Sequence, residues 1–270
     1  MIAMRLIRCL CLFAAPTLVA YDFSDNADYL SPASQWPAWY DTVKRASDEE
    51  NVIRACLENK NQCERWLRPL HVIVDRSRAL THKQQLEIVN RYVNQHRHYR
   101  RDRRSPDTTP WGDEGVFSQW STLLEFLQKG GDCEDYATAK YMILRLIGYS
   151  PAALRIVVVY DRKTREYHAV VAVLDEQGNT RLLDIDNRIY QGNPAAYRYV
   201  YAINETSIWD HSVASTLPKR RPRRNRYTIV RRSKIVFVDT NPPQDHAALS
   251  KWKTHRLQEA RTLSQDCLAL

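Results

Sequence analysis

The spacing of apolar residues changes abruptly near the middle of this 270-residue chain. Before Gly148 the apolar residues recur at intervals of three and four, which is typical of amphipathic helices. After Pro151 they come in short β-branched runs, LRIVVVY and YHAVVAVL, joined by the hairpin-length connection DRKTRE. Helices followed by antiparallel strands are typical of an α+β domain. We therefore expect N-terminal helices and then an antiparallel sheet.

The expected elements can be placed on the chain. Helices are predicted over Gln35 to Ser47, Asp48 to Leu67 (one helix or a pair), His82 to His98, Thr122 to Gln128, Cys133 to Ile147 and Leu249 to Leu263. Strands are predicted over Leu154 to Tyr160, Tyr167 to Leu174, Thr180 to Asp184, Tyr199 to Ile203 and Tyr227 to Val238.

The first 20 residues have the three-part pattern of a secretory signal peptide. Arg5 and Arg8 precede an apolar run that ends at Ala20, and polar sequence follows. The run is too short to cross a bilayer as a helix. We expect cleavage after Ala20 and an exported chain that does not itself span a membrane; an uncleaved anchor is the weaker alternative.

The net charge of +9 is unevenly distributed, because six cations lie between Lys219 and Arg226. We interpret residues 215–234 as a basic insertion that faces solvent. An anionic lipid surface or an acidic protein patch remains a possible partner. Nucleic acid is not an expected partner, since the chain has an export signal and no recognised nucleic-acid-binding motif.

Four cysteines remain once the signal peptide is removed: Cys56, Cys63, Cys133 and Cys267. Cys56 and Cys63 are seven residues apart, and in an oxidising compartment we expect them to form a local disulfide. Zinc is disfavoured because no further Cys or His stands nearby at ligand spacing.

Two glycines, Gly130 and Gly131, stand just before Cys133 in the stretch GGDCEDYA. Glycine allows close backbone approach, and Cys133 opens a predicted helix. The N–H groups and the positive dipole end at a helix start both stabilise a thiolate. A lone cysteine near a helix is more often an inert buried residue, so its partners decide its role.

Downstream residues supply those partners. His168 stands at a predicted strand start, whereas the other seven histidines lie in helical or loop sequence. Its imidazole would take the thiol proton and return it to the leaving group. Asp184 and Asp186 both stand at a strand end, on the same side at a period of two. We prefer Asp186 as the residue that orients His168, because Asn187 follows it and the chain leaves the sheet there. The order Cys, His, Asp indicates a cysteine hydrolase.

Acidic residues surround the candidate nucleophile. Asp132, Glu134 and Asp135 flank the cysteine, and like charges raise the pKa of a thiol. The helix dipole is worth less than about 1 kcal/mol at an exposed site, too little to offset three carboxylates. A hard cation would compensate, and these carboxylates fit part of a Ca²⁺ site. Helix capping, or pairing with Arg145 or Arg155, is the alternative.

These motifs together resemble the bacterial transglutaminase-like cysteine peptidases of the LapG type. The resemblance rests on QWSTLLEFLQKGGDCEDYATAKYMILRLIGY, then YHAVVAV, then LDIDNR, and it runs from Trp36 to Trp209 and returns at Leu249 to Trp252. It implies a papain-like core in transglutaminase-type arrangement within residues 21–270, and a periplasmic location. It also implies a catalytic triad of Cys133, His168 and the Asp of the Asp-Asn pair, Asp186. Either aspartate of LDIDN can align with that position.

The resemblance has further implications for cofactor and partners. It implies calcium as the cofactor, with Asp132, Glu134 and Asp135 as ligands. It implies cleavage of a large surface adhesin near its N-terminus, which promotes biofilm dispersal. It also implies control by the periplasmic domain of an inner-membrane receptor that senses cyclic di-GMP. Amide transfer on the same triad, or a non-catalytic module that only binds receptor or adhesin, are the rival functions.

Overall fold

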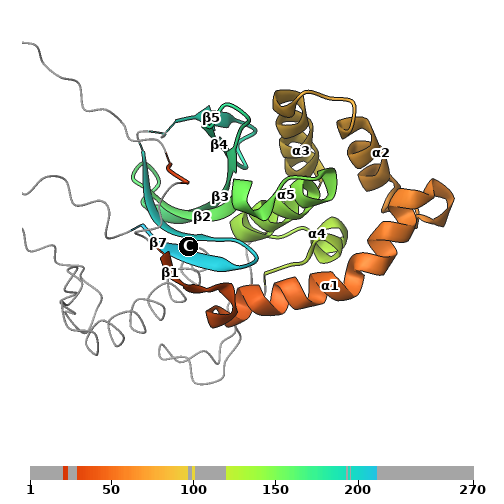
Figure 1. Ribbon diagram of the computed structural model, residues 1–270, viewed down its shortest axis with the longest axis horizontal. Coiled ribbons are helices and arrows are strands. Elements are labelled where there is room, and N and C mark those ends of the chain that lie inside the picture. Colours follow the sequence, from red (N-terminus) through yellow and green to blue (C-terminus); the bar gives the residue numbers. More distant parts are fainter. Residues whose placement is uncertain are drawn as a thin grey trace, which may run out of the picture.

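The computed structural model describes residues 21–23, 29–96, 99–100, 120–192, 194 and 196–211. Within these residues seven strands form one sheet in the order β1-β7-β6-β2-β3-β4-β5, and every neighbouring pair is antiparallel. The helices lie to one side of the sheet, and α5 packs directly on β2 and β3 (Figure 1). The predicted α+β class is confirmed.

The helices and strands have the following bounds. The helices are α1 (Pro37–Glu58), α2 (Arg68–Ser77), α3 (His82–His96), α4 (Leu123–Lys129) and α5 (Cys133–Ile147). The strands are β1 (Tyr29–Pro32), β2 (Leu154–Asp161), β3 (Glu166–Leu174), β4 (Thr180–Leu183), β5 (Ile189–Gln191), β6 (Tyr197–Ile203) and β7 (Ser207–Asp210).

Several elements differ from the sequence prediction. Helix α1 is continuous through Ser47, so no separate helix begins at Asp48, and the segment before Leu67 is a short 3-10 turn and loop. Strand β1 was not predicted, because it is short and its partner β7 lies far along the chain, with Tyr29 opposite Trp209. Four predicted features lie outside the described residues: the signal peptide, the basic insertion at 215–234, the strand at Tyr227 to Val238 and the helix at Leu249 to Leu263.

The core explains why α5 is the central helix. Eleven of its 15 residues are buried, and they fill the space between the sheet and helices α3 and α4. Val171 and Val173 on β3 face this layer, whereas Val170 and Ala172 belong to a second apolar cluster. That alternation is the period of two expected for a strand covered on both faces. The first residue of α5 is therefore held by a packed layer.

The predicted disulfide between Cys56 and Cys63 is present. It closes the loop that connects the end of α1 to α2. In the chain-entropy account, closing a loop of this length stabilises the folded state by about 2 kcal/mol. Cys133 is buried and takes no part in a disulfide, so its thiol is retained, as a nucleophile requires.

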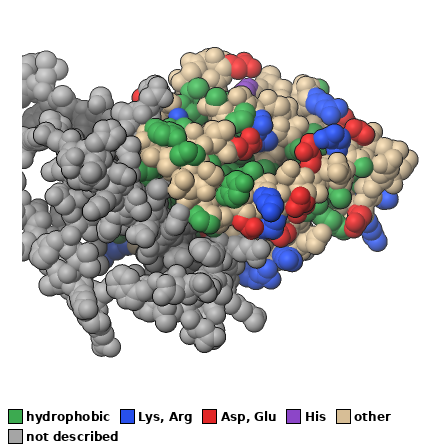
Figure 2. All heavy atoms as spheres, turned by 60° about the horizontal axis from the view of Figure 1, so that its bottom comes forward, with side chains coloured by type: hydrophobic (Ala, Val, Ile, Leu, Met, Phe, Trp, Pro, Cys, Tyr) green, Lys and Arg blue, Asp and Glu red, His purple; other side chains and the backbone are tan. Residues whose placement is uncertain are grey.

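The surface of the helical side carries charges of both signs. Lys and Arg are interspersed with Asp and Glu and with apolar side chains on the face shown in Figure 2. On that face the described residues form no large patch of a single sign. None of the described helices is both long and apolar enough to cross a membrane.

Candidate active site

Cys133 is the first residue of α5 and is only 2% exposed. Gly130 ends α4 at a φ of 71°, a conformation that favours glycine. A Cβ on Gly131 would lie 1.8 Å from Asp135 Oδ2, so no other residue fits there without a shift of that carboxylate. Both glycines are thus needed for the tight connection that brings the thiol to a helix start.

His168 lies between Cys133 and a carboxylate. Its Nε2 atom is 2.6 Å from Asp184 Oδ1, and its side chain is also hydrogen-bonded to Cys133. Because Nε2 is engaged by Asp184, Nδ1 is the nitrogen left for the thiol. Three side chains from α5, β3 and the turn after β4 therefore form a continuous line.

The aspartate in this line is Asp184, so the preference for Asp186 is corrected. Strand β4 ends at Leu183 and residues 184–187 form a turn, in which Asn187 has a φ of 65°. The period-of-two argument fails because the strand stops before either aspartate. Asp186 instead accepts the Arg188 N–H at 2.9 Å, and its side chain is 41% exposed.

The environment of His168 favours its protonated form. Burial opposes a charged imidazole, but the hydrogen bonds and charges of Asp184 and Cys133 outweigh burial and raise the pKa of His168 to about 10. Burial also opposes the charge on Asp184, yet the bonds to His168 and Tyr197 hold the pKa of Asp184 below its usual value. The arrangement stabilises an imidazolium beside the sulfur.

A cleft of about 600 Å³ opens over these side chains. Cys133, His168 and Asp184 lie in its wall, together with the β2–β3 turn around Lys163 and with Tyr167. The thiol of Cys133, which is otherwise buried, therefore lies in the wall of a cleft.

The sequence profile of the bacterial transglutaminase-like cysteine proteinases matches residues 43–213, which include the whole cleft triad. The chain belongs to this family. A search among curated proteins gives no significant match.

Solved structures similar to this chain include those of LapG from Legionella pneumophila. The calcium-bound form is 25% identical, with 58% of this chain and 85% of that chain covered and a TM-score of 0.47. A second LapG structure is 24% identical, covers 60% and 86%, and has a TM-score of 0.46. The EGTA-treated form is 24% identical, covers 62% and 87%, and has a TM-score of 0.47.

In this family member the acidic residues beside Cys133 are buried. Asp132 is 0% exposed, and Glu134 and Asp135 are each 3% exposed. The thiol of Cys133 donates to Glu134 Oε2 at 3.2 Å. Burial, together with the charges of Cys133, Asp132 and Asp135, raises the pKa of Glu134 well above its ordinary value. Of the alternative roles, pairing with arginine is not seen, because Arg145 pairs with Glu205 at 2.6 Å and Arg155 stacks on Trp209. Helix capping is confirmed, because Asp132 and Asp135 form a capping box at the start of α5.

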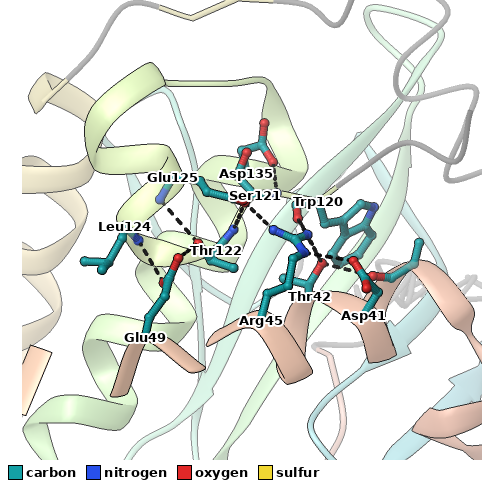
Figure 3. A network of polar contacts seen from close by, with 11 residues as sticks. Asp41, Thr42, Arg45, Glu49, Trp120, Ser121, Thr122, Leu124, Glu125 and Asp135 are labelled. Carbon is teal, nitrogen blue, oxygen red and sulfur yellow. Dashed lines mark hydrogen bonds and ion pairs between the residues drawn. The ribbon is translucent and has the colours of Figure 1, made fainter. Parts of the chain in front are cut away.

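Part of this cluster serves the fold. Arg45 and Thr42 on α1 donate to the Trp120 carbonyl at 2.7 and 2.8 Å, and Ser121 donates its N–H to Asp135 Oδ1 at 2.7 Å (Figure 3). Asp135 Oδ2 accepts the Asp132 N–H at 3.2 Å. Helix α1 thus fixes the segment before α4, and Asp135 ties that segment to the start of α5.

The donor chemistry of the acidic cluster fits a hard cation, since three buried carboxylates stand on one turn. Within the ranges that the structure describes, however, no group of three or more His, Cys, Asp and Glu side chains is arranged to hold a metal ion. Both carboxylate oxygens of Asp135 accept backbone N–H groups, and Glu134 accepts the thiol of Cys133. A Ca²⁺ shell of about six to eight ligands at this cluster would have to include other oxygens.

Two residues of the site were not singled out from the sequence. Tyr197 donates its hydroxyl to Asp184 Oδ2, and no local pattern connects a strand residue to a turn that precedes it. Lys140 is 1% exposed and lies near Asp184 and Asp186. Its position seven residues after Cys133, on the buried side of an apolar helix, was a signal that could have been used.

Proposed function

We propose that this chain is a cysteine endopeptidase with Cys133 as nucleophile, His168 as general base and acid, and Asp184 as the residue that orients the imidazole. The observation that carries the proposal is the placement of His168 between the thiol and the buried carboxylate at 2.6 Å. Membership of a cysteine proteinase family supports the same reaction class.

The geometry supports a two-step hydrolysis. Cys133 Sγ, deprotonated by His168, attacks the peptide carbonyl carbon and forms a tetrahedral intermediate, and the positive end of α5 favours the charge that develops there. His168 then returns the proton to the leaving amine as the C–N bond breaks, which leaves a thioester. Water attacks the thioester while His168 removes its proton, and the thiolate leaves as the carboxylic acid forms.

We further propose that activity depends on Ca²⁺ held at Asp132, Glu134 and Asp135. The support is electrostatic: three buried carboxylates surround a sulfur that must become an anion, and burial, followed by the charges of Cys133, Asp132 and Asp135, raises the pKa of Glu134. A bound divalent cation would lower that repulsion and hold the start of α5. No step of the hydrolysis is assigned to the ion.

The substrate and partners follow from the family resemblance. We propose a large surface adhesin cleaved near its N-terminus, a periplasmic location, and inhibition by the periplasmic domain of a cyclic di-GMP receptor. Support comes from the signal-peptide pattern of residues 1–20 and from a disulfide that suits an oxidising compartment.

The test is incubation of the purified mature chain with N-terminal regions of candidate adhesins in the presence of Ca²⁺. We expect two fragments from the wild type and intact substrate with Cys133→Ala, with equal melting temperatures for the two proteins. Mass spectrometry identifies the scissile bond. A cross-linked product would identify a transferase instead, and cleavage by Cys133→Ala would exclude this mechanism.

A further inference from the structure

Asp184 is held at both of its oxygens. Oδ1 accepts the Ile185 N–H at 2.6 Å and lies 2.6 Å from His168 Nε2. Oδ2 accepts the hydroxyl of Tyr197. The side chain is 2% exposed, so water does not compete for either oxygen.

Tyr197 is placed rigidly enough to fix this carboxylate. It is the first residue of β6 and is 7% exposed, and its backbone N–H donates to the Pro194 carbonyl at 2.9 Å. Its ring packs edge-on to the His168 ring, with centroids 6.5 Å apart. Tyr197 therefore contacts both His168 and Asp184, although its strand, β6, supplies neither of them.

We propose that Tyr197 is a positioning residue of the active site, which locks Asp184 in the orientation that holds the His168 imidazolium. The inference rests on the proposed function. A carboxylate with one free oxygen can rotate about its Cβ–Cγ bond, and rotation would remove Oδ1 from Nε2. Tyr197 prevents the rotation and stabilises the anionic form, because a hydroxyl donates only to an ionised or acceptor oxygen.

The other groups around Asp184 do not replace this contact. Lys140 on α5 and Tyr190 on β5 interact with Asp184 through charge, and Asp161 and Asp186 add negative charge nearby. Among the described residues, His168 and Tyr197 are the side chains that hydrogen-bond to Asp184. Loss of the Tyr197 hydroxyl leaves Oδ2 buried without a donor, which costs more than an exposed bond would.

The experiment compares Tyr197→Phe with Tyr190→Phe. Both changes remove one tyrosine hydroxyl near the same turn, but Tyr190 donates to Asp186 at 2.7 Å instead of Asp184. The measurement is the rate of Cys133 alkylation by iodoacetamide as a function of pH at saturating Ca²⁺, with the modified residue located by mass spectrometry. This readout needs no peptide substrate, and a residue that only supports the fold would leave the pH profile unchanged.

The acid limb of the profile is the pH range in which alkylation slows as Cys133 becomes protonated. We expect this limb to move up by about one pH unit in Tyr197→Phe, so that the alkylation rate at a pH below the limb falls about tenfold. The reason is that Asp184 takes up a proton at higher pH and a neutral carboxyl does not stabilise an imidazolium. Tyr190→Phe should keep the wild-type limb. A Tyr197→Phe profile that matches the wild type would overturn the proposal.

Fluorotyrosine in place of Tyr197 provides a second test that preserves the ring and the hydroxyl. We expect this protein to retain the low-pH reactivity of the wild type, because its hydroxyl is a stronger donor. A limb displaced upward despite the retained hydroxyl would also overturn the proposal. If wild-type Cys133 itself lacks reactivity at low pH, the triad fails instead, so the two failures are distinguishable.

Discussion

The residues on both sides of Cys133 are buried, but the charges on the two sides have opposite effects on its thiolate. On the helix side, Asp132, Glu134 and Asp135 bring carboxylates together, and burial with their mutual charges raises the pKa of Glu134. On the strand side, His168 stands beside Asp184, and these opposite charges raise the pKa of the imidazole to about 10 even though burial opposes it. One side repels a thiolate and the other attracts it.

The difference shows in which half of the site the protein's own groups pair the buried charges. Buried charges are tolerated when they are paired and hydrogen-bonded. The strand side satisfies that condition with side chains from β3, the β4–β5 turn and β6. On the helix side Asp135 accepts two backbone N–H groups, whereas Glu134 is buried among like charges. We propose that a bound cation compensates the like charges of the helix side, whereas the protein's own side chains compensate those of the strand side.

The largest expected effect comes from a substitution on the strand side, where Asp184 pairs with His168. Asp184→Asn should lower kcat about 10³-fold, because an amide both loses the charge and favours the wrong imidazole tautomer. Asp186→Asn is the matched control, two residues away in the same turn, and we expect less than about a twofold change. Steady-state cleavage of one adhesin fragment by the two variants measures this. Equal losses of kcat in the two variants, or a larger loss in Asp186→Asn, would support Asp186, the residue preferred from the sequence.

The second effect tests the helix side. Ca²⁺ at about 100 times its Kd should raise the melting temperature by about 5 °C or more, since a ligand that binds only the folded state stabilises it. Glu134→Gln should abolish most of that rise, whereas Glu58→Gln, exposed on α1, should retain it. Calorimetry with and without chelator gives the result independently of activity. A calcium response that survives in Glu134→Gln would remove this residue from the site.

The third effect concerns Lys140, the buried cation near Asp184. Burial lowers the pKa of Lys140 to about 7, so the unfolded chain binds more protons between pH 7 and about 10.4, and this residue makes stability rise with pH in that window. The raised pKa of His168 acts oppositely: its stabilisation is complete below about pH 6.5 and is lost as pH rises to about 10. The two slopes oppose each other in the wild type.

Lys140→Met should remove one of these slopes. We expect urea unfolding to show stability that falls with pH between about 7 and 10 in the variant and changes much less in the wild type. The variant should also gain most stability at pH 7 and below, where the wild type buries a charged ammonium. Parallel pH profiles for the two proteins would contradict the position assigned to Lys140.

The smallest effect on the site should come from the disulfide. Replacing Cys56 and Cys63 with serine removes a local loop closure worth about 2 kcal/mol, and a few degrees of melting temperature should be lost. Reactivity of Cys133 at saturating Ca²⁺ should not change, because the bridge lies at the far end of α1. A change in the alkylation profile would show that α1 controls the thiol through the Trp120 segment.

The sequence predicted those features that depend on local pattern. The helix that begins at Cys133, the β2–β3 hairpin and the Cys56–Cys63 bridge follow from period, turn residues and spacing. The partner of His168 did not follow, because Asp184 and Asp186 differ only in where β4 ends, and strand ends are set by pairing with β3 and β5. Tyr197 could not be predicted either, since its contact joins the start of β6 to the turn after β4, and these two strands are not neighbours in the sheet.

The most direct test of the account is the ionisation state of Cys133 itself. The ultraviolet absorbance of the thiolate, taken as the difference between wild type and Cys133→Ala, should persist to pH values well below the ordinary thiol pKa of about 8.5. His168→Gln should move the transition to about 8.5 or above, because the acidic neighbours then act unopposed. A wild-type transition at about 8.5 that does not respond to His168→Gln would contradict an imidazolium-stabilised nucleophile.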